Sequence, residues 1–383
     1  MTSRGSAYIT DTSSFLPNAP VGNDDIEQVL GMIGGKPSRA RRIVLRNNGI
    51  RTRHYAIDPA SGEFTHSNAQ LTAEAIRGLD LAELDILACG TSCPDQLMPG
   101  HAVMVHAELG IPPCEVVSTA GICAAGIVAL KYAYMAVLSG QVRKALASGS
   151  ERASGGLLAR HYQPESEHRV SELEENPEIA FEKDFLRWML SDGAGAFMVQ
   201  DRPRANGLSL RIDWIDIQSQ AGSMPVCMYA GGDKENDGSF KGWQEYAISQ
   251  WGERSIFAVK QDVRLLNEAI VLQTFGKPLA KARAERGLTA EDIDWFLPHM
   301  SSEYFRQPLA NFMAEAGFAL PQEKWFTNLK TKGNTGSASI FIMLDELFHS
   351  NRLNTGDTLL CFVPESGRFT GSLMHLTAVD HAG

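Results

Sequence analysis

The chain has 383 residues, of which 44% are hydrophobic and 21% are charged, so it can bury a large core as one bilobed unit or two domains, and a disordered chain is excluded. Its net charge of −10 and the lack of any run of five or more Lys and Arg argue against a nucleic-acid binder. No apolar run is long enough to span a membrane, and the first residues lack the pattern of a secretory signal. The six cysteines form no CxxC pair, so we expect a cytoplasmic protein with free thiols and no metal site or disulfide framework.

Short apolar segments alternate with longer helical patterns, which is typical of an α/β fold whose central strands are covered by helices. A segment over 218–252 is rich in Gly, Ser, Asp and Lys, and we expect it to lie over the substrate region or near a subunit interface. Inside it, Asp233 begins a calcium-like loop, but the twelfth position is Gln244, so a surface loop is favoured. The expected strands are 43–45, 86–88, 114–117, 144–147, 196–199, 295–297 and 358–363, and the expected helices are 126–138, 263–274, 302–316 and 337–348.

The sequence contains an internal echo. Residues 121–126 open an apolar helix, which is followed by a turn and by a strand that ends in a Glu-bearing loop at 148–151. Residues 333–339 open a second apolar helix, which is likewise followed by a turn and by a strand that ends in a Glu-bearing loop at 364–367. The echo predicts a duplicated fold whose pseudo-twofold axis brings both helix starts and both loops to one site, with chance similarity as the alternative.

Cys123 is the strongest candidate for a nucleophile. It lies after an expected strand and at the start of an expected helix. The unpaired N–H groups of a helix start favour a thiolate, so we expect a lowered pKa for this thiol. The alternative is a buried structural cysteine, which we expect for the other five.

Two further polar residues are candidates for binding a carbonyl oxygen. His299 follows an apolar strand, where α/β folds place their sites, and its neutral ring can donate a hydrogen bond. Asn334 lies between glycines just before a helix, and its amide can act beside His299. Taken alone, each residue favours a structural role. His299 would be a histidine whose hydrogen bonds are all made within the core, and Asn334 would be a helix cap or turn residue.

Taken together, these residues resemble the ketoacyl-ACP synthase III branch of the thiolase superfamily. Cys123, His299 and Asn334 match the Cys-His-Asn triad of that family. Four more segments are similar to its motifs, and the likeness runs along nearly the whole chain: Tyr8-Ile9 through Leu16-Pro17, Asn23-Asp24, Gly49-Ile-Arg-Thr-Arg53 and Ser191-Asp-Gly-Ala-Gly-Ala196.

The resemblance implies a five-layered αβαβα fold of two pseudo-twofold-related halves, usually in a homodimer. We expect the halves at 1–200, with the nucleophile, and at 201–383, with the histidine and asparagine. It implies that Cys123 takes an acyl group from a thioester, and that His299 and Asn334 hold the enolate of a second thioester for a Claisen condensation. It also implies an oxyanion hole made by the N–H of Cys123 and one from the Ser366-Gly367 loop, and no cofactor besides acyl-ACP or acyl-CoA as substrate.

The departures from the family pattern concern charge. Met300-Ser-Ser302 replaces the usual Gln-Ala-Asn after the histidine, and Pro364-Glu-Ser-Gly-Arg-Phe369 replaces a triple glycine. The pattern looks more like the ketosynthase/cyclases that form cyclohexanedione or dialkylresorcinol rings from two acyl chains. We hypothesise that Glu151 or Glu365 is the base of ring closure and that Arg368 orients the carboxylate. A structural Glu–Arg pair is the alternative.

Partners follow from the same resemblance. An acidic acyl carrier protein needs a local basic patch, for which Lys260, Arg306, Lys330 and Lys332 are candidates, although solvated surface charge is the favoured explanation for each one. The apolar residues Phe185, Trp188 and Met189 are candidates for an acyl channel, with core packing as the alternative.

Three other functions stay open on the sequence. The first is an initiating synthase that uses malonyl-ACP in fatty-acid or polyketide synthesis. The second is an acyltransferase that makes an ester or amide. The third is a catalytically silent subunit of a heterodimeric synthase, against which the intact triad argues.

Overall fold

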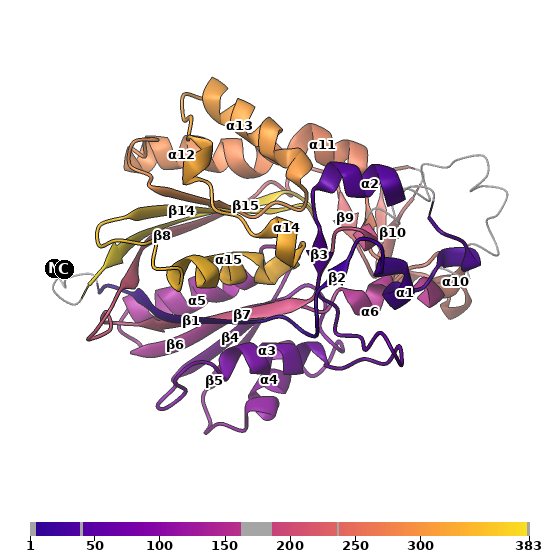
Figure 1. Ribbon diagram of the computed structural model, residues 1–383, viewed down its shortest axis with the longest axis horizontal. Coiled ribbons are helices and arrows are strands. Elements are labelled where there is room, and N and C mark those ends of the chain that lie inside the picture. Colours follow the sequence, from indigo (N-terminus) through magenta and orange to yellow (C-terminus); the bar gives the residue numbers. More distant parts are fainter. Residues whose placement is uncertain (1–4, 39–40, 162–185, 236, 381–383) are drawn as a thin grey trace.

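The computed structural model describes residues 5–38, 41–161, 186–235 and 237–380 (Figure 1). Within these residues, nine strands form one sheet in the order β13-β14-β15-β8-β1-β7-β6-β4-β5. These strands are β1 (Tyr8–Phe15), β4 (Ile86–Thr91), β5 (Glu115–Ala120), β6 (Lys144–Glu151), β7 (Gly193–Gln200), β8 (Ser209–Ser219), β13 (Trp295–Pro298), β14 (Thr358–Glu365) and β15 (Thr370–Val379).

The sheet consists of two sets of strands with the same pattern. In the first set β1 pairs antiparallel with β7, β7 antiparallel with β6, and β6 parallel with β4. In the second set β8, β15, β14 and β13 repeat these three relations in the same order. The sets join where Tyr8 and Ile9 of β1 pair with Arg211 and Leu210 of β8. The expected boundary between residues 200 and 201 falls in the connection from β7 to β8, and the division into two halves remains a prediction.

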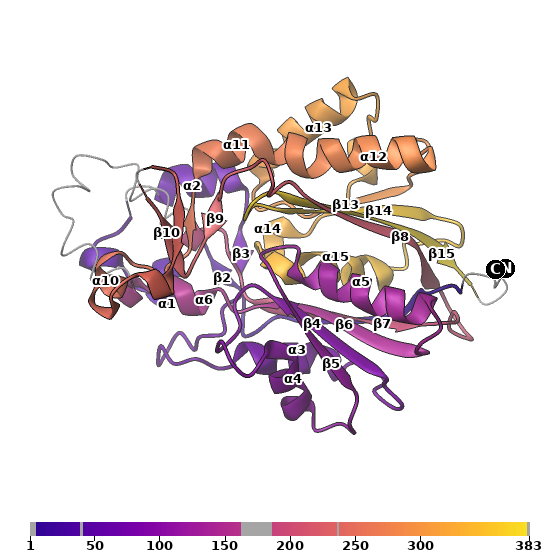
Figure 2. The ribbon, with the colours of Figure 1, turned by 180° about the vertical axis from the view of Figure 1, so that it is seen from behind.

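Helices cover the sheet in layers, which can be followed in both views (Figures 1 and 2). Helices α5 and α15 lie between the two sets of strands, α3 and α4 cover the outer face of the first, and α11, α12 and α13 cover the outer face of the second. This arrangement confirms the predicted α/β fold. The bounds of these helices are α3 (Asn68–Ile76), α4 (His101–Leu109), α5 (Ala125–Leu138), α11 (Val263–Val271), α12 (Lys277–Arg286), α13 (Arg306–Glu315) and α15 (Ser339–Phe348).

Shorter elements gather mainly at one end of the layers, where β6 and β14 end (Figure 1). No helix in the described part of the chain is long and apolar enough to cross a membrane. The shorter elements are β2 (Val21–Gly22), α1 (Ile26–Leu30), η1 (Ile33–Gly35), α2 (Arg41–Asn48), β3 (Thr52–Arg53), α6 (Ser154–Leu157), η2 (Ala159–His161), β9 (Met228–Tyr229), β10 (Gly232–Lys234), β11 (Phe240–Gly242), η3 (Trp243–Glu245), α10 (Ile248–Glu253), β12 (Lys260–Gln261), the π-helix η4 (Leu272–Gly276), η5 (Glu303–Phe305), η6 (Gln322–Lys324), α14 (Leu329–Lys332) and η7 (Gly336–Ala338).

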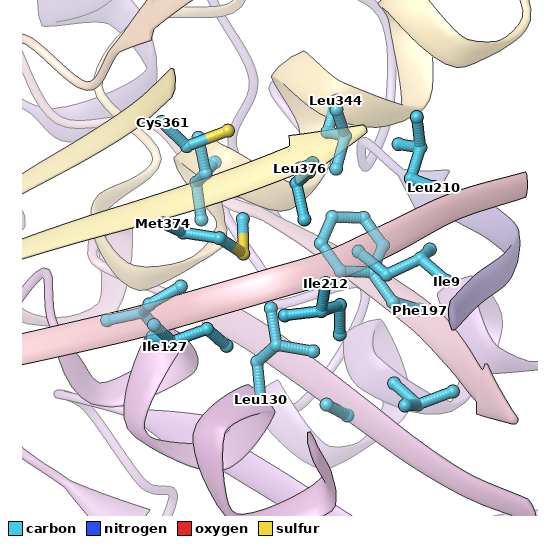
Figure 3. Packing of buried hydrophobic residues seen from close by; sticks show 14 of the residues in the cluster. Ile9, Ile127, Leu130, Phe197, Leu210, Ile212, Leu344, Cys361, Met374 and Leu376 are labelled. Carbon is cyan, nitrogen blue, oxygen red and sulfur yellow. The ribbon is translucent and has the colours of Figure 1, made fainter. Parts of the chain in front are cut away.

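The main core fills the space around the two inner helices. Ile127 and Leu130 of α5 and Leu344 of α15 pack with strand residues of both sets, including Phe197 and Met374 (Figure 3). Because both helices lie between two sets of strands, their apolar residues need not follow a single stripe. The core therefore fixes the start of each inner helix, and these starts carry the candidate site.

Two glycines allow the inner layer to close tightly. A Cβ atom on Gly126 of α5 would lie 2.5 Å from the Ser337 carbonyl oxygen, and one on Gly149 of β6 would lie 2.3 Å from the same atom. Real side chains do not tolerate such distances, so only glycine lets the backbones approach this closely. The contact brings the segment after Asn334 against the helix that follows Cys123.

Most expected elements are present, but one expected strand is wrong. Residues 43–45 lie in helix α2, because Val44 and Asn48 form a buried stripe at helical spacing while Ile43 is exposed. The strands β8 and β15 were not expected from apolar runs. In β8 the buried residues are separated by half-buried ones, as in a strand with one face toward a helix layer.

Candidate active site

A cavity of about 1020 Å³ lies at the end of the layers where β6 and β14 end. Its lining includes Cys123, His299 and Asn334, together with Glu151, Glu365 and the loop from Ser366 to Arg368. The side chains of Leu97, Phe240 and Phe257, which also line it, are 70%, 40% and 52% exposed and mark its opening to solvent. The structure thus brings together eight of the twelve residues predicted for the site, although their roles remain predictions.

Cys123 lies between β5 and α5. Strand β5 ends at Ala120, and α5 begins at Ala125, two residues after the cysteine. The side chain is partly exposed to the cavity. All six cysteines are free, which confirms the expectation of free thiols. The strand-to-helix turn that was predicted for this residue is present.

The expected lowering of the Cys123 pKa is wrong. Burial raises the pKa of this thiol, and the nearby carboxylates of Glu151 and Glu365 raise it further. A thiolate at this position would add a third negative charge to an apolar cavity, which outweighs the favourable field of the helix start. The cysteine is therefore a neutral thiol until its proton is removed or a bound group changes the local charge.

His299 follows the last residue of β13. Its N–H donates to the carbonyl oxygen of Phe362 over 2.8 Å, so it continues the pairing of β13 with β14. The side chain is 3% exposed, and burial lowers the pKa of the imidazole to about 4. The ring is thus neutral at physiological pH and can donate one N–H to a carbonyl oxygen without carrying a charge.

Asn334 is held on both sides by its backbone. Its N–H donates to the Met189 carbonyl oxygen over 3.0 Å, and its own carbonyl accepts from Ser191 N–H over 2.8 Å. The side-chain Oδ1 accepts from the N–H of Gly336 over 3.0 Å. Since Oδ1 is engaged in this turn, the NH₂ group is the end of the amide that is left to bind a ligand in the cavity.

Glu151, the last residue of β6, joins two loops of the site. Its Oε1 accepts from the N–H groups of Ser92 and Ser337 over 3.0 and 3.3 Å, and its Oε2 accepts from the Ser92 hydroxyl over 2.6 Å. A Cβ atom on Gly336 would lie 2.6 Å from Cγ of Glu151. Burial raises the pKa of this carboxyl, and the hydrogen bonds oppose that rise. Its contacts give Glu151 the role of a support for the Asn334 loop.

Glu365 occupies the matching position, as the last residue of β14. Its Oε1 accepts from the N–H of Gly367 over 2.9 Å, and it also binds the hydroxyl and N–H of Thr370. Burial is the main cause of its raised pKa. The N–H of Gly367, a candidate for the oxyanion hole, is thus bound by a carboxylate. The neighbouring Ser366 hydroxyl accepts from Gln261 Nε2 over 3.1 Å.

The proposed pairing of Arg368 with a site carboxylate is wrong. Its Nε and Nη2 donate to the Met224 carbonyl oxygen over 3.0 and 2.9 Å. Among the residues described here, no ion pair reaches Glu365. The guanidinium therefore fixes the loop around Met224, and this also removes the structural Glu–Arg pair that was considered as the alternative.

The four candidates for carrier binding have different surroundings. Lys260 is buried, and its Nζ donates to Asp233 over 3.1 Å and to the Arg254 carbonyl oxygen over 2.9 Å, so it is not a surface cation. Arg306 is paired with Glu303 over 2.7 Å and stacks on Trp325. Lys330 is exposed and Lys332 half-buried, and both lie on α14 next to the Asn334 loop.

Of the residues predicted for an acyl channel, Met189 lines the cavity. Trp188 is completely buried in a second core cluster and does not line it. Phe185 lies outside the described residues. Trp188 thus packs in the core, the alternative considered for it.

The segment over 218–252 lines the cavity with Met228, Tyr229, Phe240 and Trp243, which confirms that it lies over the site. Asp233, the start of the calcium-like loop, is instead ion-paired with Lys260 and Arg254.

The sequence analysis missed the residues that support the site. Ser92, which donates twice to Glu151, follows the end of the parallel strand β4. Thr274, in the π-helix η4, lines the cavity beside Thr370. The first could have been expected from its place at the carboxyl end of a buried parallel strand. The second depends on a local helix distortion that no apolar pattern encodes.

The electrostatics give a test. Replacing Glu365 by Gln removes one of the two negative charges beside the thiol, so we expect the pKa of Cys123 to fall and its alkylation to become faster. At a fixed pH below the pKa, a fall of half to one unit makes the thiolate about three to ten times more abundant. The rate of iodoacetamide labelling at Cys123, followed by peptide mass spectrometry from pH 7 to pH 10, measures this. Glu268→Gln on the exposed face of α11 is the charge control. Equal rates for Glu365→Gln and wild type would contradict the electrostatic account.

Comparisons with known proteins agree with this arrangement. Residues 283–375 match the family described as 3-oxoacyl-(acyl-carrier-protein) synthase III C terminal. The chain is 26% identical over 361 residues to the β-ketoacyl-(acyl-carrier-protein) synthase III of Xanthomonas oryzae pv. oryzae, covering 94% of this chain and 95% of the relative. It is 26% identical over 370 residues to the enzyme of the same name from Neisseria meningitidis serogroup C, covering 92% and 94%.

Solved structures share the fold along nearly the whole chain. AbyA1, a tetronic acid condensing enzyme, superposes with a TM-score of 0.72 at 21% identity, covering 97% of this chain and 99% of its own. OleA from Xanthomonas campestris gives 0.70 at 19% identity, covering 98% and 99%. The 3-oxoacyl-(acyl-carrier-protein) synthase III of Aquifex aeolicus gives 0.67 at 21% identity, covering 97% and 100%. The C-terminal family match, the relatives of similar length and the shared fold show that this chain is similar to ketoacyl synthase III enzymes and has their fold.

Proposed function

We propose that the protein is a ketosynthase that joins two acyl thioesters through an acyl-Cys123 intermediate and then closes a ring. The observation that carries the proposal is the meeting of Cys123, His299 and Asn334, from three separate segments, in one cavity. The same cavity is lined by the buried carboxyl group of Glu151 and the half-buried one of Glu365. A purely structural role for these polar residues gives no reason for all of them to face the same space.

In the first half-reaction Cys123 takes the acyl group. Its Sγ forms a bond to the carbonyl carbon of the first thioester, the bond from that carbon to the carrier sulfur breaks, and the carrier leaves as a thiol with the proton of Cys123. The N–H of Cys123 and an N–H of the Ser366-Gly367 loop are the candidate donors to the oxyanion. Because Gly367 N–H is bound to Glu365, that carboxylate must turn away before this donor can act.

In the second half-reaction a β-ketoacyl thioester gives the proton between its two carbonyl groups to a base of the site, and this is the proton that the Cys123 thiolate later takes back. His299 N–H and the Asn334 NH₂ group hold the resulting enolate oxygen, and the carbanion forms a carbon–carbon bond to the acyl carbon. The bond to Cys123 breaks, and the thiolate takes back a proton. For ring closure, a second carbanion attacks the remaining thioester carbonyl and releases the carrier thiol.

Glu365 is the better candidate for the base of ring closure. Glu151 accepts three hydrogen bonds that tie the Ser92 and Ser337 loops together, so moving it would disturb Asn334. Glu365 is held by a glycine N–H and by Thr370 of its own turn. A raised pKa suits a carboxylate for proton transfer near neutral pH. A protein of the same fold is named a tetronic acid condensing enzyme, which agrees with condensation chemistry on this scaffold.

The cavity suits long apolar substrates. Its volume, about 1020 Å³, is at the upper limit of the usual range for sites that hold one drug-sized molecule, roughly 300–1,000 Å³. Its lining is mostly apolar, and two acyl chains with a thioester arm need such a volume. A related structure of OleA contains bound lauric acid and lauroyl-CoA. The apolar side chains of the lining include Leu186, Met189, Leu190, Val226, Met228, Val259, Leu266, Ile270, Leu309 and Phe362.

A product assay tests the proposal. Purified protein receives an acyl thioester with a β-ketoacyl thioester, and in parallel the same acyl thioester with a malonyl thioester. We expect a cyclic diketone from the first mixture, absent with Cys123→Ala and strongly reduced with Glu365→Gln. Glu151→Gln with normal ring formation would exclude Glu151 as the base and leave it its supporting role. No ring from any mixture would refute the proposal.

A chain-initiating synthase is the second candidate, because the relatives of similar length carry that name. In this reaction the loss of carbon dioxide from a malonyl group supplies the carbanion, so no carboxylate base is needed. A linear β-ketoacyl product from the malonyl mixture alone would establish this function instead.

The protein is also proposed to act as a homodimer. Strand β5 forms one edge of the sheet, and its residues are exposed or half-buried along its whole length. Glu115, Ser118 and Ala120 are exposed. An open edge strand is a template for pairing with a second copy. Light scattering with a β5 variant that carries a proline would test this pairing.

A further inference from the structure

We propose that Gln261 accepts a hydrogen bond from a hydroxyl group on the acyl chain, close to its carbonyl carbon, so that the acyl donor of this site is a 3-hydroxyacyl thioester. This inference rests on the proposed function and names its substrate class. Gln261, the last residue of β12, lines the cavity although it is only 4% exposed. A buried amide of this kind needs partners for both of its ends.

The Ser366 hydroxyl fixes which end of the amide it binds. Gln261 Nε2 donates to Ser366 Oγ over 3.1 Å, and the Ser366 hydroxyl donates in turn to Met228 Sδ over 3.4 Å. Because the hydrogen of the serine is directed at the sulfur, its oxygen accepts from the glutamine. The Oε1 atom of Gln261 therefore points away from Ser366.

This oxygen is the unpartnered end of the amide. In the part of the chain that the structure describes, no backbone or side-chain donor binds Gln261 Oε1, and the atom is not enclosed by protein atoms. It therefore faces the cavity that the residue lines. A carbonyl oxygen only accepts hydrogen bonds, so a ligand that satisfies it has to bring a hydroxyl or an N–H.

Thr274 offers a second acceptor on the same side of the cavity. This residue of the π-helix η4 is completely buried and lines the cavity, and its hydroxyl donates to the Ile270 carbonyl oxygen over 2.6 Å. Since its hydrogen is used there, the Thr274 Oγ1 atom also has only acceptor positions left. A Cβ atom on Gly371 would collide with the Thr274 carbonyl oxygen, so η4 lies directly against the start of β15.

The position of Gln261 indicates which part of the substrate it meets. Its partner Ser366 precedes Gly367, whose N–H is a candidate donor to the acyl oxyanion. A Cβ atom on Gly367 would lie 3.1 Å from Cδ1 of Ile122, the neighbour of Cys123. The unpaired oxygen is thus attached to the loop that would hold the acyl carbonyl, and a hydroxyl two carbons from that carbonyl is a donor at the right place.

The two acceptors border the apolar side of the cavity and not its opening. Between Gln261 and Thr274 the chain forms α11, whose Leu266 and Ile270 are buried and line the cavity. Both views show α11 next to β9, the strand that pairs with β12 (Figures 1 and 2). An acyl chain suits this side. The arm of a thioester also carries N–H groups, but it is common to all donors, so donors that differ only in the acyl chain separate the two sources.

The test compares three donors on one arm: octanoyl, 3-hydroxyoctanoyl and 8-hydroxyoctanoyl N-acetylcysteamine. Acylation of Cys123 is followed by intact mass in single turnovers. We expect one enantiomer of the 3-hydroxyoctanoyl donor to react about ten to a hundred times more efficiently than octanoyl, because an apolar chain leaves the buried oxygen unpaired. The 8-hydroxyoctanoyl donor, whose hydroxyl lies at the far end of the chain, should show no such preference.

Gln261→Met removes the acceptor and keeps the length of the side chain. We expect the ratio of 3-hydroxyoctanoyl to octanoyl acylation to fall to within a few-fold of unity, because only the hydroxylated donor loses a bond. Thr274→Val keeps the shape of the side chain and should lower the same ratio by a smaller factor. Gln307→Met, at an exposed glutamine of α13, is the matched control and should leave the ratio unchanged.

Three outcomes would overturn the proposal. The first is equal acylation of the wild type by the octanoyl and 3-hydroxyoctanoyl donors. The second is a preference that survives in Gln261→Met. The third is an equal loss with all three donors in Gln261→Met, which would assign the glutamine to the thioester arm or to the support of Ser366.

Binding to Cys123→Ala separates this inference from the proposed function. This variant has no sulfur to acylate, so isothermal titration calorimetry measures its affinity for the same intact thioesters. If the 3-hydroxyoctanoyl thioester binds more tightly in a manner that depends on Gln261, but no donor acylates the wild type, the proposed function fails and the hydroxyl site stands. Acylation of Cys123 without any preference among the donors keeps the proposed function and refutes the hydroxyl site.

Discussion

Cys123→Ala should abolish both the covalent acylation of the protein and all product formation. Without Sγ the acyl group has no covalent carrier, and the condensation would require both thioesters to react directly. Loss of a nucleophile in an active site of this kind lowers the rate by about four orders of magnitude or more. Intact mass after incubation with an acyl thioester measures the first step, and product mass spectrometry measures the second.

Cys93→Ala is the matched control for this experiment. Cys93 lines the same cavity, and burial together with the nearby Glu151 raises its pKa to about 12. It does not lie at a helix start, and its N–H donates to the Thr91 hydroxyl over 3.1 Å. We expect Cys93→Ala to be acylated like the wild type. If Cys123→Ala were still acylated and Cys93→Ala were not, Cys93 would be the nucleophile.

The elements that the sequence predicted well are those whose pattern is set by burial alone. Strands β4, β6, β7 and β14 are almost completely buried, so each reads as a continuous apolar run. The inner helix α5 begins within one residue of the expected position. By contrast, β8 is half-buried over most of its length, and β15 has polar residues at its half-buried positions, so neither forms a continuous apolar run. Helix α2 was misread because Ile43, an exposed residue, completed an apolar triplet.

The site could be predicted where local motifs carry the chemistry. Cys123, His299 and Asn334 each follow or precede a predictable element, and all three line one cavity. Their electrostatics could not be predicted in the same way. The raised pKa of Cys123 depends on carboxylates that come from β6 and β14, and these strands are far apart in the sequence.

The carrier candidates show the same limit. Lys260 and Arg306 have the charge that a carrier requires, but only the fold shows that the first is buried against Asp233 and the second is paired with Glu303. Charge along a sequence identifies ionisable groups, whereas the fold decides which of them are free. Of the four candidates, Lys330 and Lys332 of α14 form no ion pair within the described residues.

The cavity combines a neutral thiol with a neutral imidazole. Burial raises the pKa of Cys123 and lowers that of His299 to about 4, so a thiolate–imidazolium pair is not the resting state. The nearby carboxyl groups of Glu151 and Glu365 also raise the pKa of this thiol. Proton removal from Cys123 therefore has to be coupled to the arrival of the thioester, whose leaving sulfur can take the proton.

His299→Ala should separate the two half-reactions. Acylation of Cys123 needs the thiol and the oxyanion donors, which come from other segments, so we expect acyl-enzyme to form at a rate within a few-fold of the wild type. The condensation needs a donor to the enolate oxygen, and removal of one such donor costs about 10²–10³ in rate. The acyl-enzyme should accumulate, which quench-flow mass spectrometry detects directly.

The pH dependence and a conservative variant identify the role of the ring. Because the pKa of His299 is about 4, the ring stays neutral between about pH 5 and pH 8, and the condensation should show no histidine titration in that range. His299→Gln keeps an N–H donor and should recover part of the lost rate. His106→Ala, on the outer helix α4, is the histidine control. Equal loss of acylation and condensation in His299→Ala would show that the ring acts already in the first step, as a base for Cys123, and the assignment to the enolate would be wrong.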